Sequence, residues 1–289
     1  MNHQIEPQRF IDTLLPVVRQ CAQASVIFYG QVADIGKEVD RGLTGDEAQA
    51  ASTAFTALDS GLQDILLSVV LQHFPEIGII AEENTPLKRR FTRTTSPYLV
   101  IVDPIDGTWH FKRGDAPYHI TIGLAYNGKM LASVVARPSE DKIFTAIRSQ
   151  GAFVQRGTGR MKRLRVPKRT QHNKVFISSK ARDYQKLARQ HYGLLPREHP
   201  LGAALVLTQI AEGKLIGYLT RQVEIYDAGP PSLIAEEAGA RCLIGPNRGP
   251  NYVKRRKFAH FMAAANKDVE EKLMAIICHA RAANVSTPH

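Results

Sequence analysis

The chain has 289 residues, 44% of them hydrophobic and 22% charged, a composition that excludes intrinsic disorder as the default description. Its formal net charge of +11 favours anionic ligands such as phosphorylated metabolites, nucleic acid or an anionic membrane surface. Three widely separated cysteines give no disulfide framework, the N-terminus has no apolar signal segment, and no apolar run could cross a membrane, so we expect a cytoplasmic protein without membrane partners.

The first half of the chain predicts two helices followed by a series of strands. Apolar residues recur at helical spacing over 8–29 and 60–73, and Pro75 ends the second helix. The pattern then changes to short apolar or alternating runs, which are typical of strands. These runs are 77–81, 98–102, 119–126, 130–136, 142–147 and 152–155. The turn signals Asn127-Gly128 and Gln150-Gly151 predict two hairpins, so these later strands are antiparallel.

The second half mixes strands and helices. Strands are predicted over 175–178, 215–220 and 258–264, and helices over 203–212, 228–238 and 268–277. Because the two kinds of element are segregated in places and alternate in others, we expect a layered α+β fold. We expect two subdomains that meet near residues 150–156, an N-terminal one over 1–152 and a C-terminal one over 153–289 that completes the site.

Two acids follow the strand predicted over 98–102 and carry the strongest chemical signal in the sequence. Asp103 and Asp106 lie on either side of a proline, which turns the chain out of the strand. Gly107 lets the backbone approach a ligand closely, and Thr108 can cap the turn or a following helix, whose N–H groups favour an anion. Two carboxylates this close repel unless a cation joins them, and oxygen ligands suit Mg²⁺. The segment therefore predicts a metal–phosphate site.

Further acids follow other apolar runs. Glu82 and Glu83 come after the strand predicted over 77–81, and Asp227 precedes small residues and a helix. Each has an ordinary alternative explanation, because an Asp at this position is often only a helix cap and an exposed Glu pair is often only a solvated loop. Their shared placement at the ends of apolar runs favours one site built from all of them.

These motifs resemble the inositol monophosphatase family, within the lithium-sensitive, magnesium-dependent sugar-phosphatase superfamily. The first family signature, D-P-(I/L)-D-G-T-x-N-F, is similar to residues 103–111, and the second, W-D-x-A-(A/G), to residues 226–230. Weaker elements agree in their order: T-x-x-D at 56–59, G-E-E at 81–83 and A-A-N at 264–266. The resemblance implies a layered α-β-α-β-α sandwich, hydrolysis of a phosphate monoester by metal-activated water, a homodimer and inhibition by Li⁺.

The resemblance also implies a role for each matched residue. It assigns two or three Mg²⁺ ions to ligands that are mostly acidic. The metal ligands would be Glu82, Asp103, the carbonyl of Ile105, Asp106 and Asp227. The catalytic set would be Glu82, Thr108 and Asp59, in which Thr108 pairs with Asp59 to orient and deprotonate the attacking water. Backbone N–H groups of Gly107 and Thr108 would hold the phosphate, and Asp227 would also face the substrate.

Substrate choice is less well defined by the sequence. The segment 31–53 does not show the lysine-containing loop familiar in the family, and Thr220 stands where inositol-hydrolysing members commonly place a Glu. The nearby Arg221 and Glu224 could contact the substrate instead. Inositol monophosphatase-like activity therefore stands beside fructose-1,6-bisphosphatase, histidinol-phosphatase and 3′-phosphonucleotidase activity as alternatives.

A basic stretch supports a hypothesis from a different class. Residues 156–174 contain no acid and many cations, among them Arg160, Lys162, Arg163, Arg165, Lys168 and Arg169. Such a stretch is usually a solvated loop, but it is also typical of nucleic-acid binding, which would make the protein a catalytically weak regulator that binds RNA or protein. The aromatic residues that favour single-strand binding are absent from this stretch.

Overall fold

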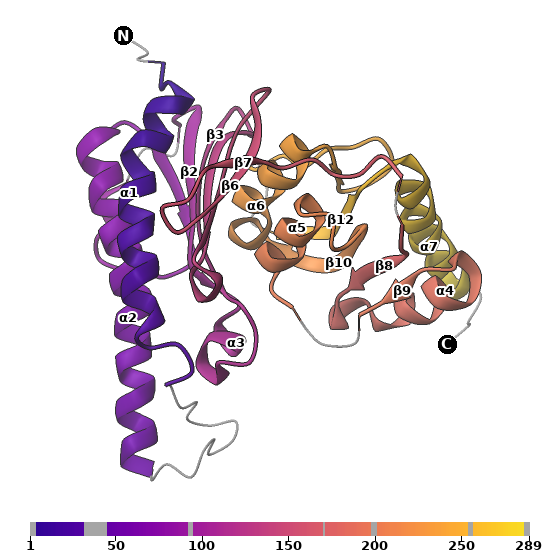
Figure 1. Ribbon diagram of the computed structural model, residues 1–289, viewed down its shortest axis with the longest axis horizontal. Coiled ribbons are helices and arrows are strands. Elements are labelled where there is room, and N and C mark those ends of the chain that lie inside the picture. Colours follow the sequence, from indigo (N-terminus) through magenta and orange to yellow (C-terminus); the bar gives the residue numbers. More distant parts are fainter. Residues whose placement is uncertain are drawn as a thin grey trace.

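The computed structural model describes residues 4–31, 45–91, 95–169, 171–197, 201–253 and 257–285. Helices and sheets alternate in layers: a helix pair, a seven-stranded sheet, a second helix pair, a five-stranded sheet and a third helix pair (Figure 1). The layered α-β-α-β-α sandwich is therefore confirmed. In the described part of the chain, none of the helices combines the length and hydropathy needed to span a membrane.

The first layer consists of α1 (Pro7–Val26) and α2 (Gly45–His73). Buried residues of both helices, such as Phe10 and Leu66, form one core with the inner face of the first sheet. Helix α2 begins well before residue 60, where apolar periodicity first predicted it. The preceding sequence is rich in alanine, which favours a helix without producing an apolar stripe.

The first sheet keeps its strands in chain order. They are β1 (Gly78–Ala81), β2 (Tyr98–Asp106), β3 (His119–Tyr126), β4 (Lys129–Arg137), β5 (Lys142–Ile147), β6 (Gly151–Arg156) and β7 (Lys162–Arg163). Strands β1 and β2 are parallel, and every later pair in the sheet is antiparallel, so the two hairpins are confirmed. At the first hairpin, φ is 45° at Asn127 and 79° at Gly128, a left-handed turn that suits these residues. The sheet continues to Arg163, past the subdomain boundary expected at residue 152.

The remaining layers come from the second half of the chain. Helices α5 (Ala203–Ala211) and α6 (Ile225–Ala238) fill the space between the two sheets, where they form an apolar core with both. The second sheet has the order β11-β12-β10-β8-β9. Its strands are β8 (Lys174–Ile177), β9 (Leu195–Pro196), β10 (Gly217–Glu224), β11 (Arg241–Leu243) and β12 (Lys257–Ala264). Helices α4 (Arg182–Tyr192) and α7 (Lys267–Val285) cover its outer face.

Several elements differ from the sequence prediction. Helix α6 starts at Ile225, so Asp227 lies inside its first turn and does not precede it. Helix α4 was not predicted, because most of its residues are polar and only a narrow stripe, including Tyr184 and Ala188, is buried. The short strands β7, β9 and β11 were also missed, since two or three residues carry no readable alternation.

Candidate metal centre and active site

Asp103 and Asp106 lie at the end of β2 beside its antiparallel neighbour β3. The pairing of the strands shifts between these two residues, where Pro104 interrupts the ladder. The N–H of Ile105 donates to Oδ1 of Asp103 at 3.0 Å, which fixes the turn. Only 1% of Asp103 and 5% of Asp106 is exposed. The strand therefore ends in two carboxylates that are almost fully withdrawn from water.

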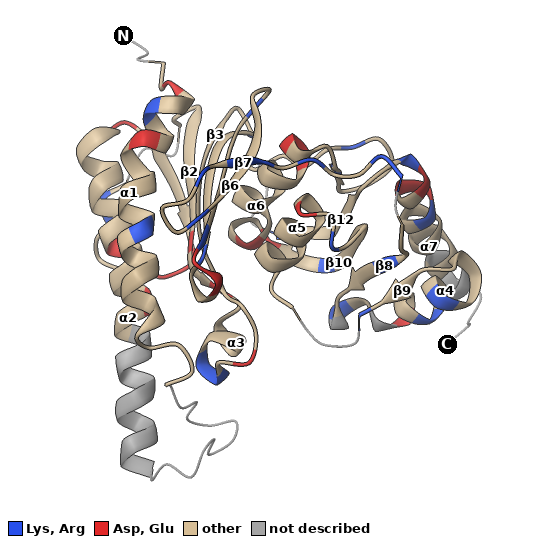
Figure 2. Cartoon of the chain, in the orientation of Figure 1, with Lys and Arg blue, Asp and Glu red and all other residues tan. Residues whose placement is uncertain are grey.

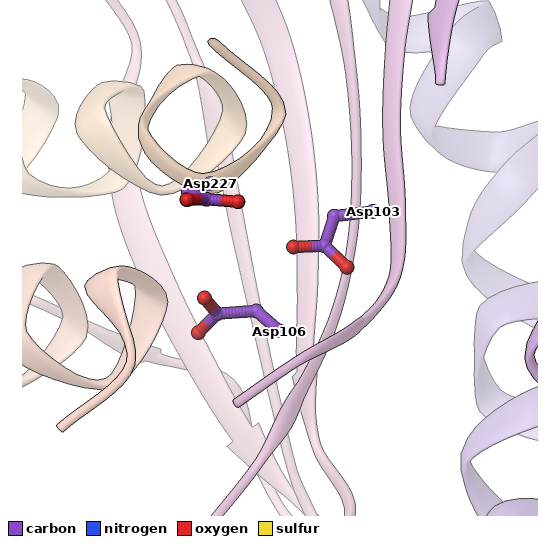
Figure 3. A group of neighbouring side chains, drawn as sticks. All are labelled: Asp103, Asp106 and Asp227. Atoms are coloured by element: carbon purple, nitrogen blue, oxygen red, sulfur yellow. The ribbon is translucent and has the colours of Figure 1, made fainter. Parts of the chain in front are cut away.

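The first turn of α6 carries a third carboxylate to the same place. Asp103, Asp106 and Asp227 each offer an oxygen, and these oxygens all lie within 4.8 Å of one another. Figure 3 shows the three side chains converging from β2 and α6 on the space between them. The sequence prediction of one acidic cluster from segments more than 100 residues apart therefore agrees with the structure at these residues.

Glu82 extends the cluster from the neighbouring strand. Because β1 runs parallel to β2, the chain that leaves β1 emerges at the same edge of the sheet, and Glu82 N–H donates to the carbonyl of Val102 at 3.3 Å. A side-chain hydrogen bond joins Glu82 to Asp103. The amide of Gln63 on α2 bonds both the N–H and the carbonyl of Glu83, at 2.8 and 2.9 Å, and so holds this loop in place.

The electrostatics of the cluster call for a cation. Burial, followed by repulsion from Glu82, Asp106 and Asp227, raises the pKa of Asp103 well above its ordinary value. Burial is also the main cause that raises the pKa of Asp106 to about 7 and that of Asp227 to about 8. Four neighbouring carboxylates, two of them buried and two partly buried, cannot all be ionised without a compensating positive charge. An all-oxygen donor set of this kind fits Mg²⁺.

Asp59 and Thr108 stand beside this cluster but do not form the expected pair. The hydroxyl of Thr108 donates to the carbonyl of Ile105 at 3.0 Å. Oδ1 of Asp59, a residue only 4% exposed, has no hydrogen-bond partner among the described residues. Burial, then repulsion from Glu82 and Glu83, raises the pKa of Asp59 to about 8. The Thr108–Asp59 hydrogen bond is thus absent here, because the nearby carbonyl of Ile105 accepts from the hydroxyl.

Glycine allows two close backbone approaches at the site. Gly107 adopts a left-handed conformation, with φ of 87°, between the end of β2 and the short helix α3 (Thr108–Arg113). Gly202 precedes α5, and a Cβ at this residue would lie 2.5 Å from Oδ2 of Asp106. The N–H of Ala204 donates to the same oxygen at 3.1 Å. Sequence reasoning missed this contact with α5, for which a glycine directly before a helix was the only signal.

The predicted substrate residues Arg221 and Glu224 both have ionic partners. Arg221 forms a two-fold ion pair with Asp183, at 2.8 and 3.1 Å, and its guanidinium lies 3.9 Å from the ring centre of Tyr184. Glu224 pairs with Lys257 at 2.6 Å. Contact of either side chain with a substrate therefore requires that its ion pair open. Residues 32–44, part of the segment that does not show the family's lysine-containing loop, lie outside the described residues.

Position 220 is tied into a network of neutral hydroxyls. The hydroxyls of Thr220 and Ser178 lie 2.7 Å apart, and Tyr218 also hydrogen-bonds Thr220. Thr220 is only 3% exposed. The place where inositol-hydrolysing members carry an acid is therefore neutral and internally bonded in this chain.

Comparisons with known proteins point to one family. The model of the inositol monophosphatase family matches residues 17–282. Among curated proteins, the Nus factor SuhB of Pasteurella multocida is 27% identical over 76% of this chain and 81% of its own length. Inositol monophosphatase 1 of Bos taurus is 24% identical over 88% of this chain and 93% of its own length.

Solved structures support the same fold. An IMPase from Thermotoga maritima superposes with a TM-score of 0.72 at 20% identity, over 94% of this chain and 97% of its own. Mycobacterium tuberculosis SuhB gives 0.69 at 23% identity, over 96% of this chain and 98% of its own. With the family model matching nearly the whole chain, the conclusion is that this protein belongs to the inositol monophosphatase family.

Proposed function

We propose that the protein hydrolyses small phosphate monoesters in a Mg²⁺-dependent reaction. The observation that supports this most directly is the convergence of the Asp103, Asp106 and Asp227 carboxylates within 4.8 Å, with Asp103 and Asp106 buried and Asp227 partly buried, where their negative charges need a cation. The ligands proposed for two or three ions are Glu82, Asp103, the carbonyl of Ile105, Asp106 and Asp227. When bound, Mg²⁺ lowers the pKa of a coordinated water and offsets charge on the phosphoryl group.

The chain's own residues then position the water and the ester. We assign to Thr108 the orientation of the attacking water through its hydroxyl, which first has to turn away from the carbonyl of Ile105. Asp59, with one buried oxygen free of hydrogen bonds among the described residues, is the acceptor proposed for the proton of that hydroxyl. Backbone N–H groups of Gly107 and Thr108 are proposed to hold the phosphate. Such positioning supplies much of the rate in phosphoryl transfer.

The neutral environment of Thr220 bears on the choice of ester. An inositol ring held by a carboxylate at this position would lose that contact here, while esters held by their phosphate alone would not. Inositol, sugar, histidinol and nucleotide phosphates are therefore all candidate substrates. Arg221 and Glu224 are candidates for contacts to the leaving group once their ion pairs open.

The test is phosphate release from a panel of these esters with Mg²⁺, with EDTA and with Li⁺ added. We expect turnover that EDTA abolishes, that Li⁺ inhibits and that Asp103→Asn lacks. A matched control is Asp268→Asn, which removes an exposed carboxylate on α7 whose partner is Lys272. Negligible turnover of every ester by wild-type protein would refute the proposal. The molecular mass of the protein in the same buffer, measured in solution, tests the homodimer that the resemblance implies.

A second function is favoured by the basic stretch. The cations between β6 and β8 that the structure describes are exposed, and Figure 2 shows them along β7 and the segment that crosses to the second sheet. Two similar curated proteins bear the name Nus factor SuhB. We propose that this segment binds RNA, with affinity that falls as salt rises. Replacing Arg165 and Lys168 with Ser should weaken binding without loss of phosphatase activity, and absence of RNA binding at low salt would reject this function.

A further inference from the structure

A fully buried arginine lies at the end of β4, on the side of the first sheet that faces α5. The guanidinium of Arg137 donates through Nε to Nε2 of His119 at 3.1 Å and through Nη2 to the hydroxyl of Thr208 at 2.6 Å. Its Nη1 donates to Glu140 and Glu212, at 3.1 and 3.0 Å. A buried arginine is tolerated only when its donors are satisfied in this way. All three residues of the inner group, Arg137, His119 and Thr208, are completely inaccessible.

His119 connects this arginine to the acidic cluster. It lies on β3, directly opposite Asp106 in the pairing with β2. A guanidinium has no lone pair to offer, so Nε2 of His119 must accept and the proton of the neutral ring must be on Nδ1. Nδ1 lies 4.0 Å from Oδ2 of Asp106 and has no hydrogen-bond partner among the described residues. A buried N–H group without a partner therefore faces this carboxylate.

Thr208 makes a second connection to the same oxygen. Its hydroxyl accepts from Arg137 and donates to the carbonyl of Ala204, one turn earlier in α5, at 2.7 Å. The N–H of Ala204 in turn donates to Oδ2 of Asp106 at 3.1 Å. One group from β3 and one from α5 that face Oδ2 are thus both braced by one guanidinium.

The charge of Arg137 is compensated on the side away from the cluster. Glu140 and Glu212 share its Nη1, and Lys142 bridges the same two carboxylates at 2.6 and 2.9 Å. Because these two carboxylates neutralise the guanidinium locally, Arg137 acts on Asp106 by orienting the hydrogen-bond donors that face its carboxylate. Groups of this kind, one step behind a metal ligand, fix the ligand's orientation.

We propose that Arg137 and His119 are positioning residues for Asp106. They fix Oδ2 of Asp106 against β3 and α5, which leaves Oδ1 for the cation that the carboxylates share. The inference rests on the proposed function, since Asp106 is there a metal ligand. Neither residue belongs to the motifs that revealed the site, and both lie in strands whose neighbouring residues are apolar.

Two substitutions at His119 separate the functions of its two nitrogens. Asparagine can place an amide N–H near the position of Nδ1, toward Asp106, while glutamine can place its carbonyl near Nε2, toward Arg137. We expect His119→Gln to weaken Mg²⁺ binding by ~10–100-fold, the usual effect of losing an outer partner of a ligand. His119→Asn should bind Mg²⁺ more tightly than His119→Gln does. Arg137→Met should resemble His119→Gln.

Calorimetric titration of chelator-treated protein with Mg²⁺ measures these affinities, and thermal unfolding confirms that each variant is folded. Glu140→Gln is the matched control: it disturbs the same ion cluster but leaves the contacts of Arg137 with His119 and Thr208, so its Mg²⁺ affinity should equal that of wild type. If neither His119 variant folds, Thr208→Val removes the second connection with little change of shape and should also weaken Mg²⁺ binding.

The outcomes distinguish this inference from the proposed function. Wild-type protein that binds no Mg²⁺ would reject both. If wild-type protein binds Mg²⁺ and His119→Gln binds it with the same affinity, the positioning role is rejected and the phosphatase proposal stands. If the His119 variants do not fold, an unchanged Mg²⁺ affinity in Thr208→Val leads to the same conclusion. A kcat that falls in His119→Gln even at saturating Mg²⁺, with an unchanged KM for the ester, would support the positioning role further.

Discussion

Replacing Gly202 with Ala should lower the rate of catalysis strongly while it lowers the free energy of unfolding only moderately. The backbone of Gly202, with φ of −64° and ψ of 153°, accepts any residue, so the effect of the substitution comes only from the added methyl group. That carbon would lie 2.5 Å from Oδ2 of Asp106 and 3.1 Å from its Cγ. Since non-bonded heavy atoms attract each other only at separations of ~3.5 Å or more, the carboxylate of Asp106 has to move by roughly 1 Å.

A displacement of this size is small for folding but large for catalysis. The side chain of Asp106 can rotate, which limits the loss of stability to about 1–3 kcal/mol. The rotation changes the position of the carboxylate relative to Asp103 and Asp227, however, and a shift of about 1 Å at a reacting centre can cost ~100-fold in rate. That loss corresponds to about 2.7 kcal/mol of transition-state stabilisation.

The assay is Mg²⁺-dependent phosphate release, with urea unfolding of the same samples. Gly61→Ala is the matched control, because a Cβ at this position in α2 meets nothing within 4 Å and should stabilise the helix by about 0.5–1 kcal/mol with wild-type activity. Wild-type kcat and Mg²⁺ affinity in Gly202→Ala would refute the claim that α5 fixes Asp106 in a catalytic position.

Three further predictions concern charge, proton transfer and substrate contact. In metal-free protein, the raised pKa values of Asp59, Asp106 and Asp227 exceed their unfolded value of ~3.9, so the folded state binds more protons and the free energy of unfolding should fall as pH rises from about 4 to about 8. Urea titrations with EDTA should show this slope and those with Mg²⁺ should not; equal slopes would contradict it. Thr108→Val should lower kcat by ~10²–10⁴-fold while Thr108→Ser keeps most of it, and equal losses in the two variants would exclude a role for the hydroxyl. Arg221→Ala should leave kcat near wild type and change KM only for esters whose leaving group reaches β10; an unchanged KM across the panel would remove Arg221 from the substrate site.

Sequence patterns predicted the elements of the fold best where the spacing of apolar residues and the residues of the adjoining turn indicate the same structure. Asn127-Gly128 specified a hairpin because both residues tolerate the left-handed backbone, and the turn has this geometry. The acids of the cluster were recognised because they follow apolar strands, whose ends meet at one edge of a sheet. Helix α4 could not be recognised in this way, since its buried stripe is narrow and its other residues are polar.

The parts of the site that escaped prediction are contacts between distant segments. His119 and Arg137 stand at the ends of strands that are mostly apolar in the sequence, and only the strand register places His119 opposite Asp106, where Arg137 can reach its ring. The expected Thr108–Asp59 hydrogen bond is not formed in the structure, where the hydroxyl of Thr108 donates to the carbonyl of Ile105 at 3.0 Å. A sequence motif shows which residues are present. Which acceptor the hydroxyl of Thr108 bonds depends on the backbone geometry of the turn.

The phosphatase proposal depends on carboxylates from β2 and α6 that hold the catalytic Mg²⁺. The most direct measurement is the rate of phosphate release as a function of Mg²⁺ concentration for wild type and Asp227→Asn, using the ester that wild type hydrolyses fastest. We expect wild-type activity that saturates with Mg²⁺, and a variant that needs at least ~10-fold more Mg²⁺ and still reaches a lower kcat. Superimposable Mg²⁺ curves for the two proteins would contradict the assignment of Asp227 as a ligand of the catalytic Mg²⁺.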